Sequence, residues 1–91
     1  GVSNFSSVIN FIMMPNPASD VLYVSYDLDK SSAVAITIVD LTGRRIRNVL
    51  NENQTIGKHN QMIQLNGLAS GIYLLNFATE FGSLNSKFVK E

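Results

Sequence analysis

The residues able to perform acid–base or nucleophilic chemistry are few and scattered in this 91-residue chain. His59 is the single histidine, and no Gly-x-Ser-x-Gly turn presents a serine as a nucleophile. A Ser-His-Asp hydrolase needs a base held against its nucleophile, so His59 is interpreted as a solvent-exposed side chain next to a turn. The chain has no cysteine, which excludes disulfides and thiolate metal sites. We therefore expect no enzyme and no cofactor.

Asp27 and Asp29 form a D-x-D pair that resembles the start of a calcium-binding loop. A loop that begins at Asp27 needs a glycine where Ser32 stands and a bidentate glutamate where Ile38 stands. Without these two residues, the pattern favours a solvated loop, and a weak surface calcium site is the alternative.

Tyrosines and asparagines offer two further binding patterns. Tyr23, Tyr26 and Tyr73 could line a sugar-binding face, although packing in the core or across strands is the favoured role of each. Residues 4–6 (NFS) and 53–55 (NQT) fit the N-glycosylation pattern, which is short and matters only in a eukaryotic secretory host. Neither pattern alone assigns a function.

Charge and length narrow the class of protein. The seven basic and seven acidic residues cancel, and the dense basic cluster is limited to Arg44, Arg45 and Arg47. Because nucleic-acid binding needs clustered lysines and arginines over a larger surface, no nucleic-acid partner is expected, and these arginines are interpreted as solvated hairpin charges. A hydrophobic content of 45% suits one folded domain with one core.

Apolar residues recur with the period of two that is typical of half-buried strands. In residues 21–27, Leu22, Val24 and Tyr26 share one face, and residues 33–40 alternate in the same way. Turn sequences separate such runs at 15–20, 40–43, 66–67 and 80–83. Polar loops are expected at 27–32 and 51–58. The pattern predicts an all-β fold, an antiparallel β-sandwich of about seven strands at 8–14, 21–27, 33–40, 44–50, 59–65, 71–79 and 83–91.

A strand corner is predicted where the sequence reads LASGIYLLNF, residues 68–77. Leu68 is expected to be buried as the chain leaves one sheet, and Gly71 to adopt a backbone conformation that other residues avoid. Tyr73 is expected to enter the core and return its hydroxyl to a backbone group near the crossing. This is the arrangement of the tyrosine corner in Greek-key sandwiches, so its role is structural.

Four stretches, PNPASDVLYV, VAITIVDLTGRRI, LNGLASGIYLLNF and the terminal KFVKE, occur in this order. Together they resemble the C-terminal sorting domain of the type IX secretion system (Por secretion system) of Bacteroidetes-type bacteria. The resemblance covers residues 15–91, so residues 1–14 are interpreted as a linker remnant with a candidate first strand. Met14 departs from the family, which often has an aromatic residue there. The matching positions are Pro15, Asn16, Pro17, Asp40, Gly43, Arg44, Arg45, Leu68, Gly71, Tyr73, Lys87 and Lys90.

The resemblance implies an immunoglobulin-like antiparallel β-sandwich that acts as a secretion signal, without catalysis of its own. Such domains follow a cargo domain in cis, are recognised by the outer-membrane translocon, and are usually removed by a surface sortase. The implied route runs from the periplasm to the outer-membrane surface or the medium. Cleavage is expected before Pro15, within or upstream of residues 1–14.

The surface that carries the signal is expected at the loops around Gly43 and Gly71 and at the terminal strand, with Lys87, Phe88, Val89 and Lys90. An exposed edge strand could bind a partner by strand addition, which equally permits weak or domain-swapped homodimers. Two alternatives are a carbohydrate-binding or adhesive β-sandwich module of a surface protein, and an inert spacer domain.

Overall fold

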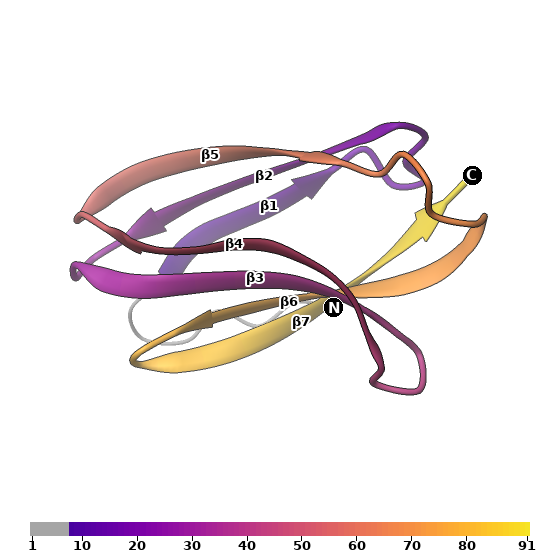
Figure 1. The fold of residues 1–91 in the computed structure, drawn as a ribbon. Helices are drawn as coiled ribbons and strands as arrows, with labels where there is room; N and C mark the ends of the chain where they lie inside the picture. The colour runs from indigo at the N-terminus through magenta and orange to yellow at the C-terminus, as the bar shows by residue number, and fades with distance from the viewer. Residues whose placement is uncertain (1–7) are drawn as a thin grey trace.

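A computed structural model describes residues 8–91, apart from the side chain of Ile9. This part of the chain forms seven strands and no helix (Figure 1). The strands are β1 (Val8–Met14), β2 (Val21–Leu28), β3 (Ser32–Asp40), β4 (Arg45–Gln54), β5 (Gly57–Gln64), β6 (Gly71–Thr79) and β7 (Gly82–Lys90).

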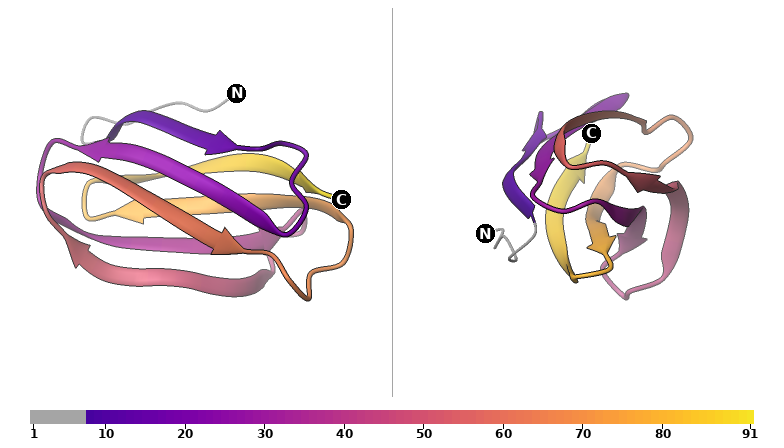
Figure 2. Two further views of the ribbon diagram at one scale, coloured as in Figure 1. Left: turned by 90° about the horizontal axis from the view of Figure 1, so that it is seen from above. Right: turned by 90° about the vertical axis from the view of Figure 1, so that its left-hand side faces the viewer.

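The strands form two sheets that pack face to face. One sheet has the order β1-β2-β5 and the other β4-β3-β6-β7, and every pair of neighbouring strands is antiparallel. The chain changes sheet between β2 and β3, between β4 and β5, and between β5 and β6. Figure 2 shows the two layers from above and from one end. The expected immunoglobulin-like antiparallel sandwich is therefore confirmed.

The core lies between the sheets, and the alternation seen in the sequence explains it. Buried residues alternate with more exposed ones along most of β2, β3 and β6, because successive side chains of a strand point to opposite faces. Rings fill the centre: Phe77 packs edge-on against Tyr26 at 4.6 Å and against Phe11 at 5.5 Å between centroids. The fully buried large side chains are Tyr26, Phe77, Phe88, Leu22, Ile36, Ile38, Ile63, Leu65, Leu75, Val8, Val24 and Val34.

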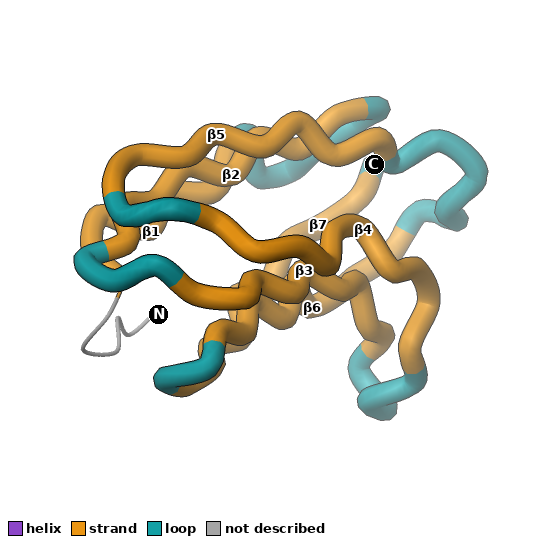
Figure 3. The backbone as a smooth tube through the Cα atoms, turned by 60° about the vertical axis from the view of Figure 1, so that its left-hand side comes forward, coloured by secondary structure: helices purple, strands orange, loops and turns teal. Residues whose placement is uncertain are grey.

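The polar loop expected at 51–58 is wrong. β4 continues to Gln54 and β5 begins at Gly57, so only Thr55 and Ile56 connect them. Both strands lie at sheet edges, where main-chain pairing to one neighbour forms a strand without apolar side chains. The loop expected at 27–32 also shortens, because Leu28 and Ser32 are buried strand residues. Figure 3 shows the resulting short turns, in teal, at the two ends of the sandwich.

Candidate recognition surface

The turn between β3 and β4 is built on Asp40. Its Oδ1 accepts hydrogen bonds from the Thr42 hydroxyl at 2.5 Å, the Thr42 N–H at 2.9 Å and the Arg44 N–H at 3.0 Å. The Thr42 hydroxyl is the main reason why the pKa of Asp40 lies below its ordinary value. Gly43 has a φ of 88°, which a side chain would strain, and its N–H donates to the Asp40 carbonyl at 3.0 Å. The tight turn predicted at 40–43 is thus confirmed.

The crossing from β5 to β6 has the predicted tyrosine corner. The Tyr73 hydroxyl donates to the Ala69 carbonyl at 2.7 Å, while the ring lies in the core and stacks on Phe88 at 5.8 Å. Leu68 is half-buried and packs against the core, and Gly71 has a φ of 159°. The hydroxyl therefore fixes the path of the chain just before β6 begins.

The Pro15–Pro17 segment contacts the terminal strand. The Asn16 Oδ1 accepts a hydrogen bond from the Val89 N–H at 2.9 Å, and its Nδ2 donates to the Lys87 carbonyl at 3.4 Å. Ala18 then forms a parallel bridge to Lys90: its N–H donates to the Val89 carbonyl at 2.8 Å. The segment after β1 thereby pairs with the edge of the other sheet. The Pro-Asn-Pro motif is hydrogen-bonded to the terminal KFVKE motif.

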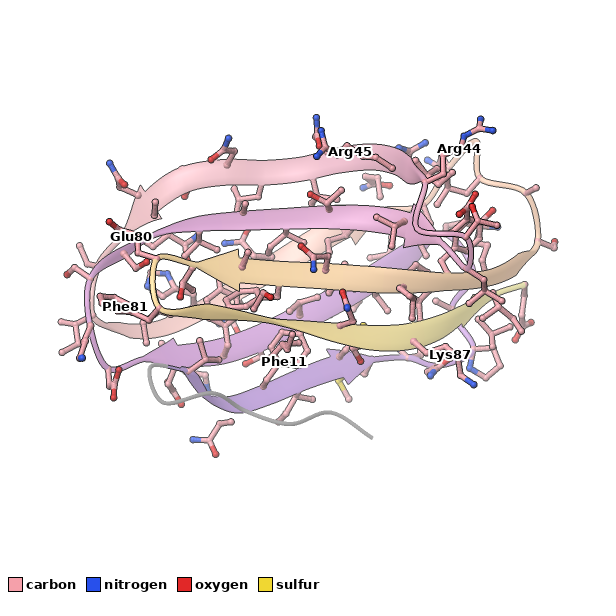
Figure 4. All side chains as sticks on the ribbon, turned by 90° about the horizontal axis from the view of Figure 1, so that it is seen from below. Phe11, Arg44, Arg45, Glu80, Phe81 and Lys87 are labelled. Carbon is pink, nitrogen blue, oxygen red and sulfur yellow. The ribbon has the colours of Figure 1, made fainter. Side chains whose placement is uncertain are left out.

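The terminal strand β7 divides the recognition candidates into two groups. Lys87 is exposed (Figure 4), and Val89 and Lys90 are half-buried. Phe88 is completely buried and belongs to the core, so its ring cannot form part of a surface in the folded domain. Gly43 is exposed and Gly71 is half-buried, each at the turn where it was expected.

The four motifs meet at one end of the sandwich. Asp40 pairs with Tyr73 across β3 and β6, and Tyr73 pairs with Phe88 across β6 and β7. The β3–β4 turn, the β5–β6 crossing, the segment after β1 and the end of β7 therefore lie at the same end, on the right in Figure 1. Segments far apart in the sequence form one continuous structural unit there.

The comparisons with known proteins point to the same family as these motifs. A family model described as a secretion system C-terminal sorting domain matches residues 13–91. The chain belongs to this family. Neither a curated protein nor a solved structure matches it. The chain is thus a C-terminal sorting domain of type IX secretion, which implies interaction with the secretion machinery, a cargo domain in cis, and export to the cell surface or extracellular space.

Arg47 has a structural role in the sorting domain that sequence reasoning missed. Its guanidinium donates to the Gln64 carbonyl at 2.9 Å and to the Asn66 carbonyl at 2.8 Å, so β4 of one sheet is tied to the end of β5 in the other. The interpretation of Arg47 as a free hairpin charge is therefore wrong. No pattern in the sequence indicates this contact, because both acceptors are main-chain atoms. Arg44 and Arg45 are exposed, and Figure 4 shows both side chains pointing outward.

An apolar groove lies on the outer face of the three-stranded sheet of the sorting domain. Met14, Tyr23 and Met62 are cross-strand neighbours on β1, β2 and β5, and each is more than half exposed. With Ile12 they line a groove of about 390 Å³ whose polar groups are neutral. Tyr26 and Tyr73 lie in the core, so a sugar-binding face formed by all three tyrosines is wrong. Burial raises the pKa of the Tyr26 hydroxyl, which donates to Gln54 at 2.5 Å.

The remaining candidates of the sequence are single side chains. Asp27 lies on β2 and accepts a hydrogen bond from Asn10 at 2.9 Å. His59 is half-buried, stacks on Tyr26 and contacts the Thr55 carbonyl at 2.7 Å, so its interpretation as a solvated residue is wrong. In residues 8–91, no group of three or more His, Cys, Asp or Glu side chains is arranged to hold a metal ion. The glycosylation pattern at 4–6 lies outside the described residues.

Proposed function

We propose that the domain directs its cargo through the outer-membrane translocon of type IX secretion by way of the periplasm, and that a surface sortase then removes it. In this role the domain is a ligand of the machinery and performs no catalysis. The observation that carries the proposal is the meeting of the four family motifs at one end of the sandwich, around the terminal strand. A signal shared by different cargo proteins needs an independent fold with one constant surface.

Burial limits where the sortase could cut. Val8 is completely buried, and β1 pairs with β2 on both sides of an irregularity between Ile9 and Ile12. A cut between residues 8 and 14 would require β1 to leave its sheet first. We therefore place the cleavage in residues 1–7 or upstream of them, which narrows the expectation of a cut within or before residues 1–14.

The test is a fusion of residues 1–91 to a foreign periplasmic protein in a bacterium with type IX secretion. The fusion protein should reach the cell surface or the medium, because the signal does not depend on the cargo. Deletion of residues 87–91 should abolish export, although removal of buried Phe88 also weakens the fold. A folded fusion that stays in the periplasm would contradict the sorting role.

A milder variant separates recognition from folding. Lys87→Ala with Lys90→Ala removes two charges at the terminal strand, and Lys58→Ala removes an exposed charge from β5 as the matched control. Lys87 and Lys58 are exposed, so each of their substitutions should change stability by less than about 0.5 kcal/mol. Because Lys90 is half-buried, thermal unfolding should show that the double variant is folded. We expect reduced export for the double variant and normal export for Lys58→Ala. Equal export of the double variant and Lys58→Ala would show that Lys87 and Lys90 are not part of the recognition surface.

Glycan binding is the second candidate function, and the apolar groove supports it. Tyr23 offers an exposed ring, and the Asn60 and Gln61 amides beside it could bind sugar hydroxyls. Titration of the isolated domain with soluble oligosaccharides tests this function, with Tyr23→Ala as the variant that should lose the signal. Binding that persists in Tyr23→Ala, or no binding by the wild type, would count against the groove.

A further inference from the structure

The free edge of β7 is the feature from which we draw a further inference. β7 is the last strand in the order β4-β3-β6-β7, so β6 is the one strand among residues 8–91 that pairs with it along its length. The pairing with β6 runs without a register shift from Gly71 opposite Lys90 to Thr79 opposite Gly82. Along β7, residues whose N–H and carbonyl groups bond to β6 therefore alternate with residues whose N–H and carbonyl groups point away from β6.

The contacts of Val89 show which residues point outward. Its N–H donates to Asn16 and its carbonyl accepts from Ala18, both on the side away from β6. Since the alternation is unbroken, Lys87, Asn85 and Ser83 present their N–H and carbonyl groups to the same side. The Lys87 carbonyl contacts Asn16 at a long 3.4 Å. Within residues 8–91, no strand pairs with this side of Ser83 and Asn85.

The edge is already used in this way by the domain itself. The segment after β1 occupies the edge from the Lys87 carbonyl to Lys90 through the Asn16 side chain and one parallel bridge. The remaining stretch, Ser83–Lys87, has regularly spaced donors and acceptors about 6.8 Å apart along the strand. Only another extended backbone matches such a row of groups.

Charge identifies the kind of strand that fits. Ser83, Asn85 and Lys87 carry the exposed side chains of this stretch, and Lys87 forms no ion pair with a described residue. Lysine on an edge is one of the features by which proteins disfavour pairing between copies, and like charges penalise every register that places the two Lys87 side chains opposite each other. It favours a partner strand that carries a carboxylate opposite Lys87.

We propose that Ser83–Lys87 of β7 accepts an extended strand of the secretion machinery, with an acidic residue opposite Lys87, and so extends the four-stranded sheet by one strand. This inference rests on the sorting function proposed above and specifies its mode of recognition. The main chain supplies most of the contact, and Lys87 adds one charge pair to an edge whose other exposed side chains, Ser83 and Asn85, are small and polar.

The test uses a substitution that removes an outward donor. Asn85→Pro deletes the N–H that faces the free edge and leaves the hydrogen bonds to β6, because proline is tolerated on the open side of an edge strand. Asn85→Ala is the matched control: it also loses the side-chain contact with Asn76 but keeps the N–H. Thermal unfolding should show that both variants are folded. If Asn85→Pro does not fold, Ser83→Pro makes the same deletion two residues earlier.

The measurement is the affinity of the purified domain for detergent-solubilised type IX translocon, with export of the fusion protein in parallel. We expect Asn85→Pro to bind at least about tenfold more weakly and to be exported poorly, and Asn85→Ala to bind within about twofold of the wild type. Lys87→Glu should bind more weakly than Lys87→Ala, because it repels the opposing carboxylate. In the complex, the amides of Ser83, Asn85 and Lys87 should exchange hydrogen more slowly, in alternation with unchanged Leu84 and Ser86.

The outcomes separate the two proposals. Wild-type domain that is neither bound nor exported would overturn the sorting function together with this inference. Normal binding and export of folded Asn85→Pro would overturn the proposed strand addition at the β7 edge but not the sorting function. Slower exchange confined to Met14, Tyr23 and Met62 would place the partner in the groove instead of at the edge. A wild-type dimer in sedimentation that Asn85→Pro dissolves would make a second copy the occupant and would overturn the inference.

Discussion

The Asn16 carboxamide accepts a hydrogen bond from the Val89 N–H across a sequence separation of 73 residues. This bond joins the end of β1 to the terminal strand, and so it links the two sheets at the end where the family motifs meet. Asparagine suits the position because its amide offers an acceptor and a donor, as a strand backbone does, and both are used.

Asn16→Ala should lower the free energy of unfolding by about 0.5–1.5 kcal/mol, since the main loss is one well-formed hydrogen bond. The loss should be local, so the Val89 amide should exchange hydrogen faster than the amides of β6. Chemical denaturation and amide exchange measure the two effects. Asn60→Ala is the matched control, because Asn60 is exposed and its side chain has no contact of this kind with a described residue. An Asn16 variant as stable as this control would show that the bond contributes nothing.

Tyr73→Phe should cost about 1–2 kcal/mol, because it removes only the hydroxyl that bonds to Ala69. Tyr73→Ala should cost about 3–5 kcal/mol, because it also opens a cavity beside Phe88. Urea denaturation gives both values. Tyr23→Phe removes an exposed hydroxyl and should be neutral. A melting temperature unchanged in Tyr73→Ala would be incompatible with the ring lying in the core.

Arg47→Lys should destabilise the domain by about 1 kcal/mol although the charge is kept. The arginine donates to two carbonyls through two nitrogens, and a lysine ammonium cannot reproduce that planar geometry. Arg44→Lys is the control and should change stability by less than about 0.5 kcal/mol, because Arg44 is exposed. Equal effects of the two substitutions would mean that the link between the sheets carries no net stability.

The stability difference between the wild type and Asp40→Asn should depend on pH. The folded pKa of Asp40 is depressed, so the ionised carboxylate stabilises the fold at pH values above its ordinary pKa of 3.8. This contribution should be lost as pH falls through the lower folded pKa, and the two proteins should then converge. Urea denaturation from pH 7 to pH 2 measures the difference.

The Thr42 hydroxyl makes the largest contribution to this pKa shift. Thr42→Ala should therefore reduce the pH-dependent difference, whereas Thr42→Ser keeps the hydroxyl and should preserve it. A difference that is the same at every pH in the wild-type background would contradict the ionic contribution of the turn.

How far the sequence predicts this fold depends on what holds each element. Strands with one buried face are visible in it, because burial imposes the alternation of Leu22, Val24 and Tyr26. The turn at Asp40 and the corner at Tyr73 are also visible, because side chains bond to backbone within a few residues. The polar end of β4 is not, because an edge strand is held by main-chain pairing that most residues can make.

The candidate surface is less predictable for a related reason. Lys87, Phe88 and Val89 are adjacent in the sequence, and only the register of β7 decides that Phe88 turns into the core while Lys87 faces solvent. The contacts of Asn16 and Arg47 depend on how the two sheets pack together, and a local sequence pattern does not predict that packing.

The position of β7 has a consequence for synthesis. Ribosomes make the chain from β1 toward β7, yet Phe88 fills the core and Val89 completes the contact with Asn16. A polypeptide whose translation stops early, or whose end has been trimmed by a protease, therefore has an open core and an unpaired first motif. The sandwich closes only when β7 has been made, so the domain cannot complete its core until translation has passed every other strand.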